Sequence, residues 1–306
     1  MNLKQLEYFV RVAELGSFSK AAVVLQVAQP ALSRQVRALE TDLRETLLLR
    51  DGRGVCLTDA GNRLFEHSVA ILQLVQRARD DIESRRGEPG GRIVIGLPPS
   101  IGRQLTRPLI DTFKSRWPRA KLAVVEGLSA HIAEWIASGR VDIGLLHNPQ
   151  GQAAIETTPI LEEPLCLVGP APATRRGRRS ALPEPVAVAD LPRYPLIVPE
   201  RSHAIRKLLD MQAALSGLKL DIAWEVSSVS AIVELVREGY GYAVLTESAV
   251  AASGEAERLA AHPLIEPQLI SVLCLAVSSS KRPSALAKQA MRLLPELARA
   301  ANVPAG

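Results

Sequence analysis

The chain contains 306 residues, 47% of them hydrophobic and 23% charged, and its formal net charge is +5. A chain of this length is expected to form about two domains, and the composition is that of an ordinary globular protein. No apolar run approaches the roughly 18 residues of a membrane span, and the N-terminal segment lacks the pattern of a secretory signal. We therefore expect a protein of the cytoplasm that does not enter a membrane.

The net charge alone does not indicate a nucleic-acid-binding protein, because the first ninety residues carry nearly as many Asp and Glu as Lys and Arg. The most basic segment is RRGRR at 175–179, whose Pro, Ala and Gly neighbours are typical of a solvated loop. A second DNA contact or an acidic partner is the alternative for this segment. Any argument for DNA binding must rest on where individual basic residues are placed.

Two short helices are predicted at the N-terminus. The first has apolar residues at helical spacing, namely Leu3, Leu6, Phe9 and Ala13. Gly16 suits the end of this helix, and Ser17 or Ser19 can cap the next one. The buried side of the second helix would consist of small and aliphatic residues, namely Ala21, Ala22 and Leu25. Small side chains allow the helices to approach closely.

A third helix is predicted with Gln29 as its cap and Pro30 at its first position, where the missing N–H of proline costs nothing. One face is an apolar stripe formed by Leu32, Val36, Leu39 and Leu43. The opposite face presents one hydroxyl and two guanidinium groups, those of Ser33, Arg34 and Arg37. Such groups can bind base edges or phosphates in the DNA major groove. An amphipathic surface helix with a solvated basic face is the alternative.

A β-hairpin is predicted after this helix, with strands at 47–49 and 55–57 and a turn at 51–54. Arg50 and Arg53 lie at its tip, where we expect them to contact backbone phosphates.

The first sixty residues resemble the winged helix-turn-helix of LysR-type transcriptional regulators. The motifs that carry the resemblance are LKQLEYFVRVAELGSFSKAA, QPALSRQVRALE and RDGRGVCLTDAG. Ala28 departs from the family, in which many members have Ser before Gln29. The resemblance implies a DNA-binding domain at 1–58, with the helix-turn-helix at about 18–37, that binds double-stranded promoter DNA. We expect the contacts to come from Gln29, Pro30, Ser33, Arg34, Arg37, Arg50 and Arg53.

A long helix is predicted from Thr58, which can cap it, to about Arg86, and we assign 59–88 to a linker. Residues repeating every seven positions indicate a seam with a second helix. We expect dimerisation through Leu64, Ile71, Val75, Ala78 and Ile82. Packing of this helix against its own domain is the alternative. The resemblance implies a homo-oligomer, dimer or tetramer, on inverted-repeat sites, with RNA polymerase as a further partner.

Residues 89–306 alternate predicted strands and helices, which indicates an α/β fold with a parallel sheet. The resemblance implies a regulatory domain with two Rossmann-like lobes, similar to periplasmic binding proteins. We place lobe I at about 92–161 and 268–306 and lobe II at about 162–267. The segments that cross between the lobes are expected near 161–164 and 264–269.

Ligands of open α/β sheets bind beyond the carboxyl ends of the strands, where helix N-termini favour anions. Seven residues at these strand ends are the predicted effector site: Pro99, Ser100, Ser129, His147, Ser202, His203 and Thr246. The effector is therefore expected to be a small organic acid. Each serine could instead be a plain helix cap, His203 could stack on the wall of the cleft, and His147 could lie on the surface. The GLPPS segment and the spacing of His203 and Arg206 resemble the branch that contains the nitrogen-assimilation-control regulator.

Other functions are less well supported by the sequence. A solute-binding protein would share the second domain but not the DNA-binding segment. No catalytic motif is found, so no enzyme is expected, and neither a cofactor nor a metal is indicated. The three cysteines, Cys56, Cys166 and Cys274, have neither metal-binding nor redox-motif spacing, and we expect them to be buried strand residues.

Overall fold

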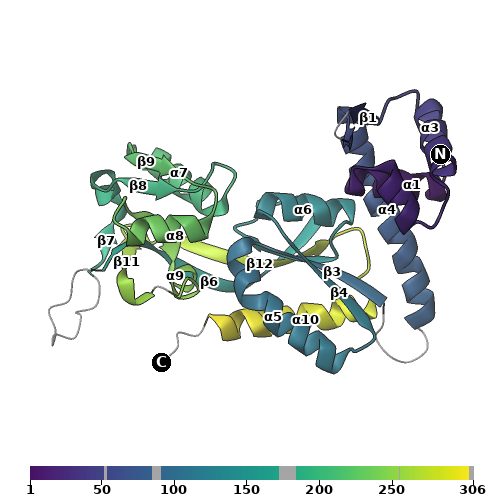
Figure 1. Ribbon diagram of the computed structural model, residues 1–306. Helices are drawn as coiled ribbons and strands as arrows, with labels where there is room; N and C mark the ends of the chain where they lie inside the picture. The colour runs from purple at the N-terminus through teal and green to yellow at the C-terminus, as the bar shows by residue number, and fades with distance from the viewer. Residues whose placement is uncertain (52–53, 85–90, 172–183, 255, 303–306) are drawn as a thin grey trace. The chain divides into compact units, whose positions relative to one another are not determined.

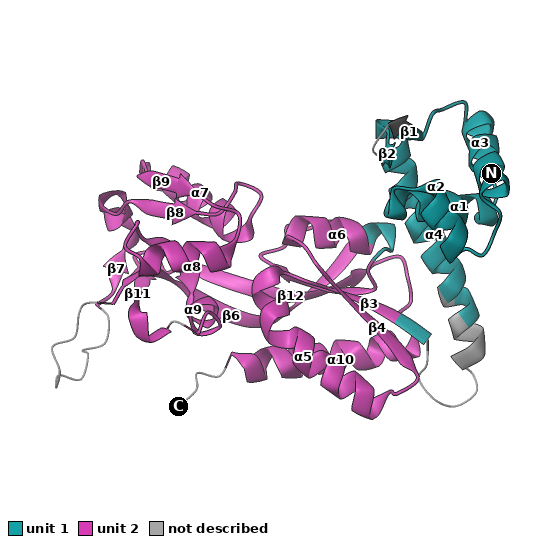
Figure 2. Cartoon of the chain, viewed as in Figure 1, with its two compact units in different colours: residues 1–92, 137–140 teal, residues 93–136, 141–306 magenta. Residues whose placement is uncertain are grey.

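The computed structural model describes residues 1–51, 54–84, 91–171, 184–254 and 256–302. The chain forms two compact units, of which unit 1 comprises residues 1–92 and 137–140, and unit 2 comprises residues 93–136 and 141–306 (Figure 2). Within the described part of the chain, no helix combines the length and the apolar character that a membrane crossing requires. The predicted basic loop at 175–179 lies outside the described residues.

Unit 1 is a small helical domain with a two-stranded hairpin, and its elements are visible in Figure 1. They are α1 (Leu3–Leu15), α2 (Phe18–Val24), α3 (Gln29–Leu43), β1 (Leu48–Asp51), β2 (Gly54–Leu57) and α4 (Asp59–Ser84). As predicted, α1 ends at Gly16, which has a φ of 58°. Ser17 rather than Ser19 caps α2, because its side chain accepts the N–H of Lys20.

The start of α3 differs by one residue from the prediction. Ala28 is the cap residue, without a side-chain hydrogen bond, and Gln29 is the first residue of the helix. The predicted cap at Gln29 is therefore wrong, and Pro30 occupies the second helical position, where its missing N–H is still harmless. The side chain of Ala28 caps nothing, but its carbonyl oxygen accepts the N–H groups of Ala31, at 2.9 Å, and Leu32, at 3.1 Å.

Four hydrogen bonds attach the hairpin region to the helices on either side of it. The Glu40 carboxylate on α3 accepts the N–H groups of Leu47, at 2.9 Å, and Leu48, at 3.2 Å. The Thr58 hydroxyl accepts the N–H of Gly61 at 2.9 Å, which caps α4 as predicted. The same hydroxyl donates to the carbonyl oxygen of Thr46 at 2.7 Å. The hairpin is thus fixed to both α3 and α4.

Lobe I of unit 2 is an α/β sandwich. Its elements are β3 (Gly91–Leu97), α5 (Pro99–Arg116), β4 (Ala120–Glu126), α6 (Ser129–Ser138), β5 (Ile143–His147) and the C-terminal helix α10 (Ala285–Ala301). Helices α5 and α10 cover one face of the sheet, where they enclose a core with Ile93, Ile95 and Leu97. Helix α6 covers the other face through Ile132 and Ile136.

Lobe II repeats this arrangement on a smaller scale. Its elements are β7 (Val186–Ala187), a 3-10 helix (Val188–Arg193), β8 (Leu196–Val198), α7 (Ala204–Leu215), β9 (Ile222–Glu225), α8 (Val229–Arg237), β10 (Ala243–Thr246), α9 (Glu247–Ala251), a second 3-10 helix (Ala256–Arg258) and β11 (Leu259–Ile265). Its core includes Leu196, Val198 and Leu245 from the strands, with Leu209 and Val233 from α7 and α8.

Two long strands belong to both lobes, namely β6 (Ile155–Pro170) and β12 (Ile270–Ser278). They lie side by side in an eight-stranded sheet with the order β4-β3-β5-β12-β6-β11-β7, in which β10 also pairs with β6. Between the lobes, 161–164 of β6 pair with 270–273 of β12. The segment predicted to cross at 161–164 lies within β6, and the one predicted at 264–269 spans the end of β11 and the connection to β12.

The expectation of a parallel sheet is correct for only part of the molecule. Strands β3 and β5 are parallel, but β12 is antiparallel to β5 and to β6. The chain returns from lobe II to lobe I through β12, and this return reverses the strand direction. The result is a mixed sheet, and the overall fold class is the predicted one.

The cysteines also differ from the prediction in one case. Cys166 and Cys274 are buried, but Cys56 is exposed on β2, because the hairpin has one face in solvent. Burial raises the pKa of the Cys166 thiol to about 12, with nearby carboxylates adding to the effect. That thiol therefore remains protonated and unreactive at neutral pH.

Gly61 provides a test of the packing of α4 against the segment before β1. A methyl group at Gly61 would lie 2.1 Å from the carbonyl oxygen of Leu47. Gly61→Ala should lower the free energy of unfolding by about 2 kcal/mol, although alanine alone favours a helix by about 1 kcal/mol. Urea unfolding followed by circular dichroism measures this difference. Gly151→Ala is the control, since nothing lies within 4 Å of a Cβ there, and equal stability of the two variants would contradict the packing.

Candidate functional site

The outer face of α3 carries most of the predicted DNA-binding residues. Gln29, Pro30, Arg34 and Arg37 are exposed, and Ser33 is half-buried. The inner face holds Leu32, Val36 and Leu39, each at most 1% exposed. The helix is therefore anchored along its apolar stripe while its guanidinium groups face solvent. The backbone of Arg50 lies in β1, but its side chain and the whole of Arg53 lie outside the described residues.

The predicted dimerisation residues of α4 fall into two groups. Leu64 and Ile71 are half-buried and pack against the core of unit 1 itself. Val75 is half-buried and Ala78 is exposed, while the side chain of Ile82 lies outside the described residues. Leu74, which the seven-residue repeat did not select, is 52% exposed. Among the described side chains of this part of α4, Leu74 and Ala78 are exposed apolar residues.

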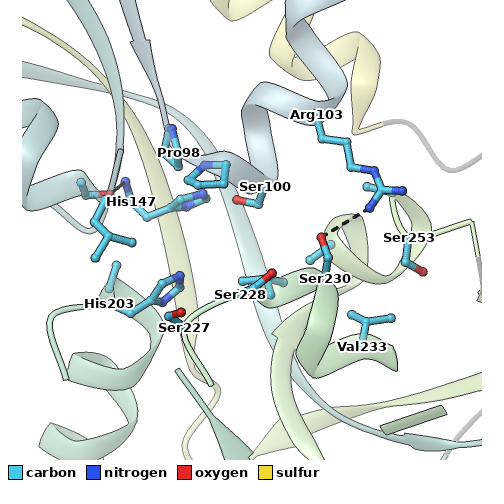
Figure 3. A pocket seen from close by; sticks show the side chains of 17 residues that line it. Pro98, Ser100, Arg103, His147, His203, Ser227, Ser228, Ser230, Val233 and Ser253 are labelled. Carbon is cyan, nitrogen blue, oxygen red and sulfur yellow. Dashed lines mark hydrogen bonds between the residues drawn. The ribbon is translucent and has the colours of Figure 1, made fainter. Parts of the chain in front are cut away.

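A cavity of about 300 Å³ lies in unit 2, between the two lobes (Figure 3). Its wall includes the first residues of four helices: Pro99 and Ser100 of α5, Ser129 of α6, Ala204 of α7, and Val229 and Ser230 of α8. Helix N-termini present free N–H groups and the positive end of the helix dipole. The cavity is therefore suited to an anionic group, and its volume is at the small end for ligand sites.

Five of the seven predicted effector residues line this cavity, namely Pro99, Ser100, Ser129, His147 and His203. Ser202 lies instead in an adjacent cavity of about 490 Å³ between α6 and α7. Thr246 is 5% exposed and its hydroxyl accepts the N–H of Ala249, so it caps α9. It lines only a small recess of about 20 Å³ next to the two histidines. Thr246 thus acts as the cap of α9.

Two groups of cavity residues were missed by the sequence analysis. Arg103 extends from α5 across the cavity, and its Nη1 donates to the Ser230 hydroxyl of α8 at 3.5 Å (Figure 3). It follows Ser100 by three residues, so the two share a helix face. Ser227, Ser228 and Ser230 surround the start of α8. These serines follow the carboxyl end of β9, which is the kind of position where ligands of open α/β sheets bind.

The two histidines of the cavity are neutral. Burial lowers the pKa of His147 to about 4, and the neighbouring His203 contributes to the shift. Burial also lowers the pKa of His203, although Glu200 acts in the opposite direction. His147 is half-buried on the cavity wall, where its backbone N–H donates to the Ser129 hydroxyl at 2.9 Å and its imidazole Nδ1 lies 3.2 Å from the Ser271 hydroxyl.

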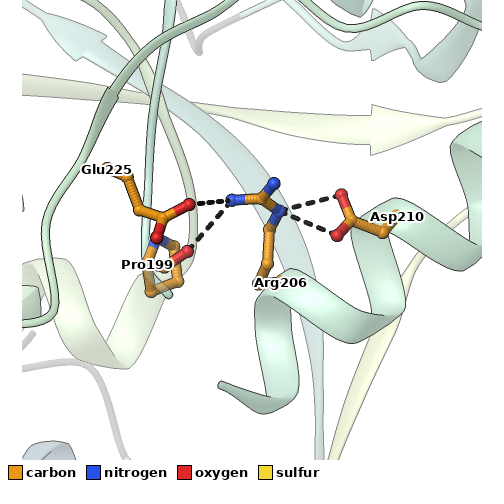
Figure 4. A network of polar contacts seen from close by, with 4 residues as sticks. All are labelled: Pro199, Arg206, Asp210 and Glu225. Carbon is orange, nitrogen blue, oxygen red and sulfur yellow. Dashed lines mark hydrogen bonds and ion pairs between the residues drawn. The ribbon is translucent and has the colours of Figure 1, made fainter. Parts of the chain in front are cut away.

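A buried arginine fixes the turn that carries His203 (Figure 4). The side chain of Arg206 is 4% exposed, and its Nε donates to both carboxylate oxygens of Asp210, at 2.8 and 2.9 Å. Its Nη1 donates to the carbonyl oxygen of Pro199 and to Glu225, both at 3.2 Å. Arg206 thus ties α7 to the loop before it and to β9. Within the described residues, no group of three His, Cys, Asp or Glu side chains could hold a metal ion.

Two family models match this chain. Residues 3–62 match the bacterial regulatory helix-turn-helix protein of the lysR family, and residues 86–299 match the LysR substrate binding domain. The second match covers more than half of the chain. The chain belongs to the LysR family of transcriptional regulators. It is a regulator with a DNA-binding helix-turn-helix and an effector-binding domain, and not an enzyme.

The relatives agree with this assignment. The nitrogen assimilation regulatory protein nac of Escherichia coli is 31% identical over 250 residues, covering 81% of this chain and 79% of the relative. The uncharacterized HTH-type transcriptional regulator YvbU of Bacillus subtilis is 29% identical, covering 97% of this chain and 99% of the relative. The likeness to the nac branch that the sequence suggested is thereby confirmed.

Solved structures show the same fold. Full-length CbnR complexed with its target DNA has a TM-score of 0.68 at 24% identity, covering 98% of this chain and 100% of that chain. A full-length variant of OxyR from Pseudomonas aeruginosa has the same TM-score and identity, covering 98% of this chain and 95% of that one.

Replacement of Arg206 tests the clamp on the cavity wall. Arg206→Met leaves Asp210 and Glu225 without their cation, but these side chains are 42% and 52% exposed, so water compensates in part. We expect the free energy of unfolding to fall by about 2 kcal/mol, less than for a fully buried pair. The control is Arg193→Met, because its ion pair with Asp190 has an arginine that is 79% exposed. In the same urea titration, Arg193→Met should lower the free energy of unfolding by at most about 0.5 kcal/mol. An equal decrease in the two variants would contradict the proposed role of Arg206.

Proposed function

We propose that this regulator binds inverted-repeat promoter DNA in the cytoplasm as a homo-oligomer, and that a small organic acid in the cavity of unit 2 controls it. RNA polymerase is a further proposed partner. The observation that carries the DNA-binding part is the outer face of α3, where Arg34 and Arg37 are exposed on a helix anchored by a buried apolar stripe. The proposed domains are 1–58 for DNA binding, 59–88 for the linker and 89–306 for effector binding.

The proposed reading of DNA places the first two turns of α3 in the major groove. Gln29, Pro30, Ser33, Arg34 and Arg37 would face the DNA, and Arg50 and Arg53 of the hairpin would contact phosphates. No side chain caps the start of α3 at Ala28. The positive end of the helix dipole there favours a phosphate group. Guanidinium groups further along the helix can form paired hydrogen bonds with guanine.

Arg34→Ala tests whether this residue reads bases. If Arg34 contacts a base edge, the free-energy difference between operator and unrelated DNA should shrink by about 1–3 kcal/mol. Fluorescence anisotropy with both DNAs at several salt concentrations measures this ratio. The control is Arg11→Ala, which removes the same charge from the outer side of α1, where Arg11 pairs with Glu14. An unchanged ratio together with a flatter salt dependence would assign Arg34 to phosphate binding instead.

The proposed oligomer is built on α4. Leu74 is exposed, and Val75 and Ala78 continue the apolar strip along the helix. Leu64 and Ile71 anchor α4 to its own domain, since they pack against the core of unit 1. An exposed leucine on a helix of 26 residues is well explained by a second copy of α4. Two-fold pairing would present two α3 helices to the two halves of an inverted repeat.

Leu74→Gln should weaken self-association without unfolding the protein, because Leu74 is already half in solvent. We expect the dissociation constant of the dimer to rise about tenfold or more, as for loss of a buried leucine at a helix seam. Sedimentation velocity over a concentration series measures it. Ile110→Gln on α5 is the control, since Ile110 is 50% exposed on unit 2. Unchanged association of Leu74→Gln would place the interface elsewhere.

The proposed effector site is the cavity lined by the four helix N-termini. Arg103 supplies a cation there, and the hydroxyls of Ser100, Ser129, Ser228 and Ser230 supply donors. Ser202 and Thr246 are not proposed as direct contacts. Contacts that join the lobes, such as Arg103 with Ser230 and Gln104 with the carbonyl oxygen of Ser248 at 3.5 Å, would be exchanged for contacts with the ligand. A ligand that prefers one lobe arrangement shifts the equilibrium toward it.

A further inference from the structure

The cavity of unit 2 contains two imidazoles that come from different lobes. His147 is the last residue of β5 in lobe I, and His203 is the cap residue of α7 in lobe II. Both line the main cavity, and both line the small recess behind it. Figure 3 shows both side chains on the same side of the cavity, opposite Arg103. An anionic group at this end would meet one titratable donor from each lobe.

His203 is held in one neutral form by its role as a helix cap. Its Nδ1 accepts the N–H of Ile205 at 3.2 Å. An imidazolium carries a hydrogen on both nitrogens and cannot accept, so protonation would remove the cap. His203 therefore keeps its hydrogen on Nε2, and this N–H is a neutral hydrogen-bond donor.

His147 is under no such constraint. Its Nδ1 lies 3.2 Å from the Ser271 hydroxyl, which can either donate or accept. Protonation of Nδ1 only reverses the direction of this hydrogen bond, and no partner is lost. Ser271 is 2% exposed on the crossing strand β12, so the contact is sheltered from water. Of the two imidazoles, His147 is the one that can become charged at no cost in hydrogen bonding.

The charged groups around the pair come from several elements. They are Arg103 on α5, Glu163 on β6, Glu200 before α7, Lys207 and Asp210 on α7, and Glu247 at the start of α9. Asp210 is neutralised by Arg206. Burial raises the pKa of Glu163, while hydrogen bonds from Ser248 act against this shift. None of these carboxylates lines the main cavity, so an entering anion would be the nearest negative charge to His147 there.

We propose that His147 and His203 together bind the carboxylate of the effector, and that His147 takes up one proton from solvent as the carboxylate enters. In the complex, the protonated His147 donates through Nδ1 to Ser271 and through Nε2 to one carboxylate oxygen, and His203 donates through Nε2. No covalent bond changes. The site thus selects a carboxylic acid with a small apolar body, for which Pro99, Leu128 and Val233 form the wall. The proposal rests on the proposed role of this cavity as the effector site.

Because carboxylate binding is coupled to protonation of His147, the affinity for the carboxylate depends on pH in a defined direction. In the empty cavity the pKa of His147 is about 4, so the imidazole is neutral at physiological pH. A bound carboxylate stabilises the imidazolium and raises that pKa. The affinity therefore increases as the pH falls from neutral toward the pKa of the free carboxylic acid, by up to tenfold per pH unit for one proton taken up.

Calorimetric titration of the full-length protein measures this proton uptake. The probes are isobutyrate, benzoate and phenylacetate, each with its neutral amide, between pH 5.5 and 7.5 in two buffers of different ionisation enthalpy. We expect uptake approaching one proton for the carboxylates and none for the amides. Nitrogen chemical shifts of histidine-labelled protein should show both ring nitrogens of His147 protonated in the complex and Nδ1 of His203 unprotonated.

Two variants separate the roles of the histidines. His147→Gln should abolish the proton uptake and flatten the pH dependence of affinity. His203→Asn retains a cap acceptor and an N–H donor, so the uptake should persist. Circular dichroism checks that both variants fold, and the nitrogen shifts of the wild-type protein test the assignment even if one does not.

The remaining outcomes would each overturn part of the proposal. Carboxylates that bind without proton uptake, or uptake that survives in His147→Gln, would overturn the role of His147. Amides that bind while carboxylates do not would leave the cavity as an effector site but exclude an acid as its ligand. If neither class of probe binds while operator DNA is still bound, both this inference and the proposed control by an organic acid fail, and DNA binding stands.

Discussion

The pairing of β6 with β12 is the interaction on which the geometry of unit 2 depends. These two strands run through both lobes, and their backbone hydrogen bonds keep 161–164 opposite 270–273 where the lobes meet. Because a strand pair can twist but cannot easily slip, the lobes can change their relative angle while the register remains fixed. The cavity lies beside this pair, so a small change of twist alters the distance between groups such as Arg103 and Ser230. The same strands carry Glu163 and Ser271, two buried polar residues that face each other in the register.

Much of the fold could be predicted from the sequence, because its signals are local. The Gly16 stop, the Ser17 cap, the apolar stripe of α3 and the hairpin depend on residues close together in the chain. The strands β7 and β11 were not predicted as strands, and the antiparallel direction of β12 was not foreseen. Both depend on contacts between segments about a hundred residues apart, such as Cys166 with Pro263 and Leu273 with Leu161. Periodicity within one segment contains no information about such partners.

The residues of the candidate site also fall into those that local sequence could locate and those that it could not. Strand ends and helix starts located Ser100, Ser129, His147 and His203, because a strand followed by a helix brings its junction to one edge of the sheet. Ser202 lines the adjacent cavity, and the side chain that caps α7 belongs to the next residue, His203. Arg103 was missed because its role depends on how far a long side chain extends across to the other lobe. On α4, the seven-residue repeat selected Leu64 and Ile71, which pack against the core of unit 1, and passed over Leu74, which is exposed.

The hydroxyl of Thr58 joins two parts of unit 1 that are usually considered separately. It accepts from Gly61 in the first turn of α4 and donates to Thr46 before the hairpin, while the N–H of Thr58 donates to the carbonyl oxygen of Leu47. These hydrogen bonds therefore fix the orientation of α4 relative to the hairpin. A rotation of α4 about its axis would therefore turn the hairpin with it and, through the Glu40 hydrogen bonds, α3 as well. The three elements would then move as one rigid body.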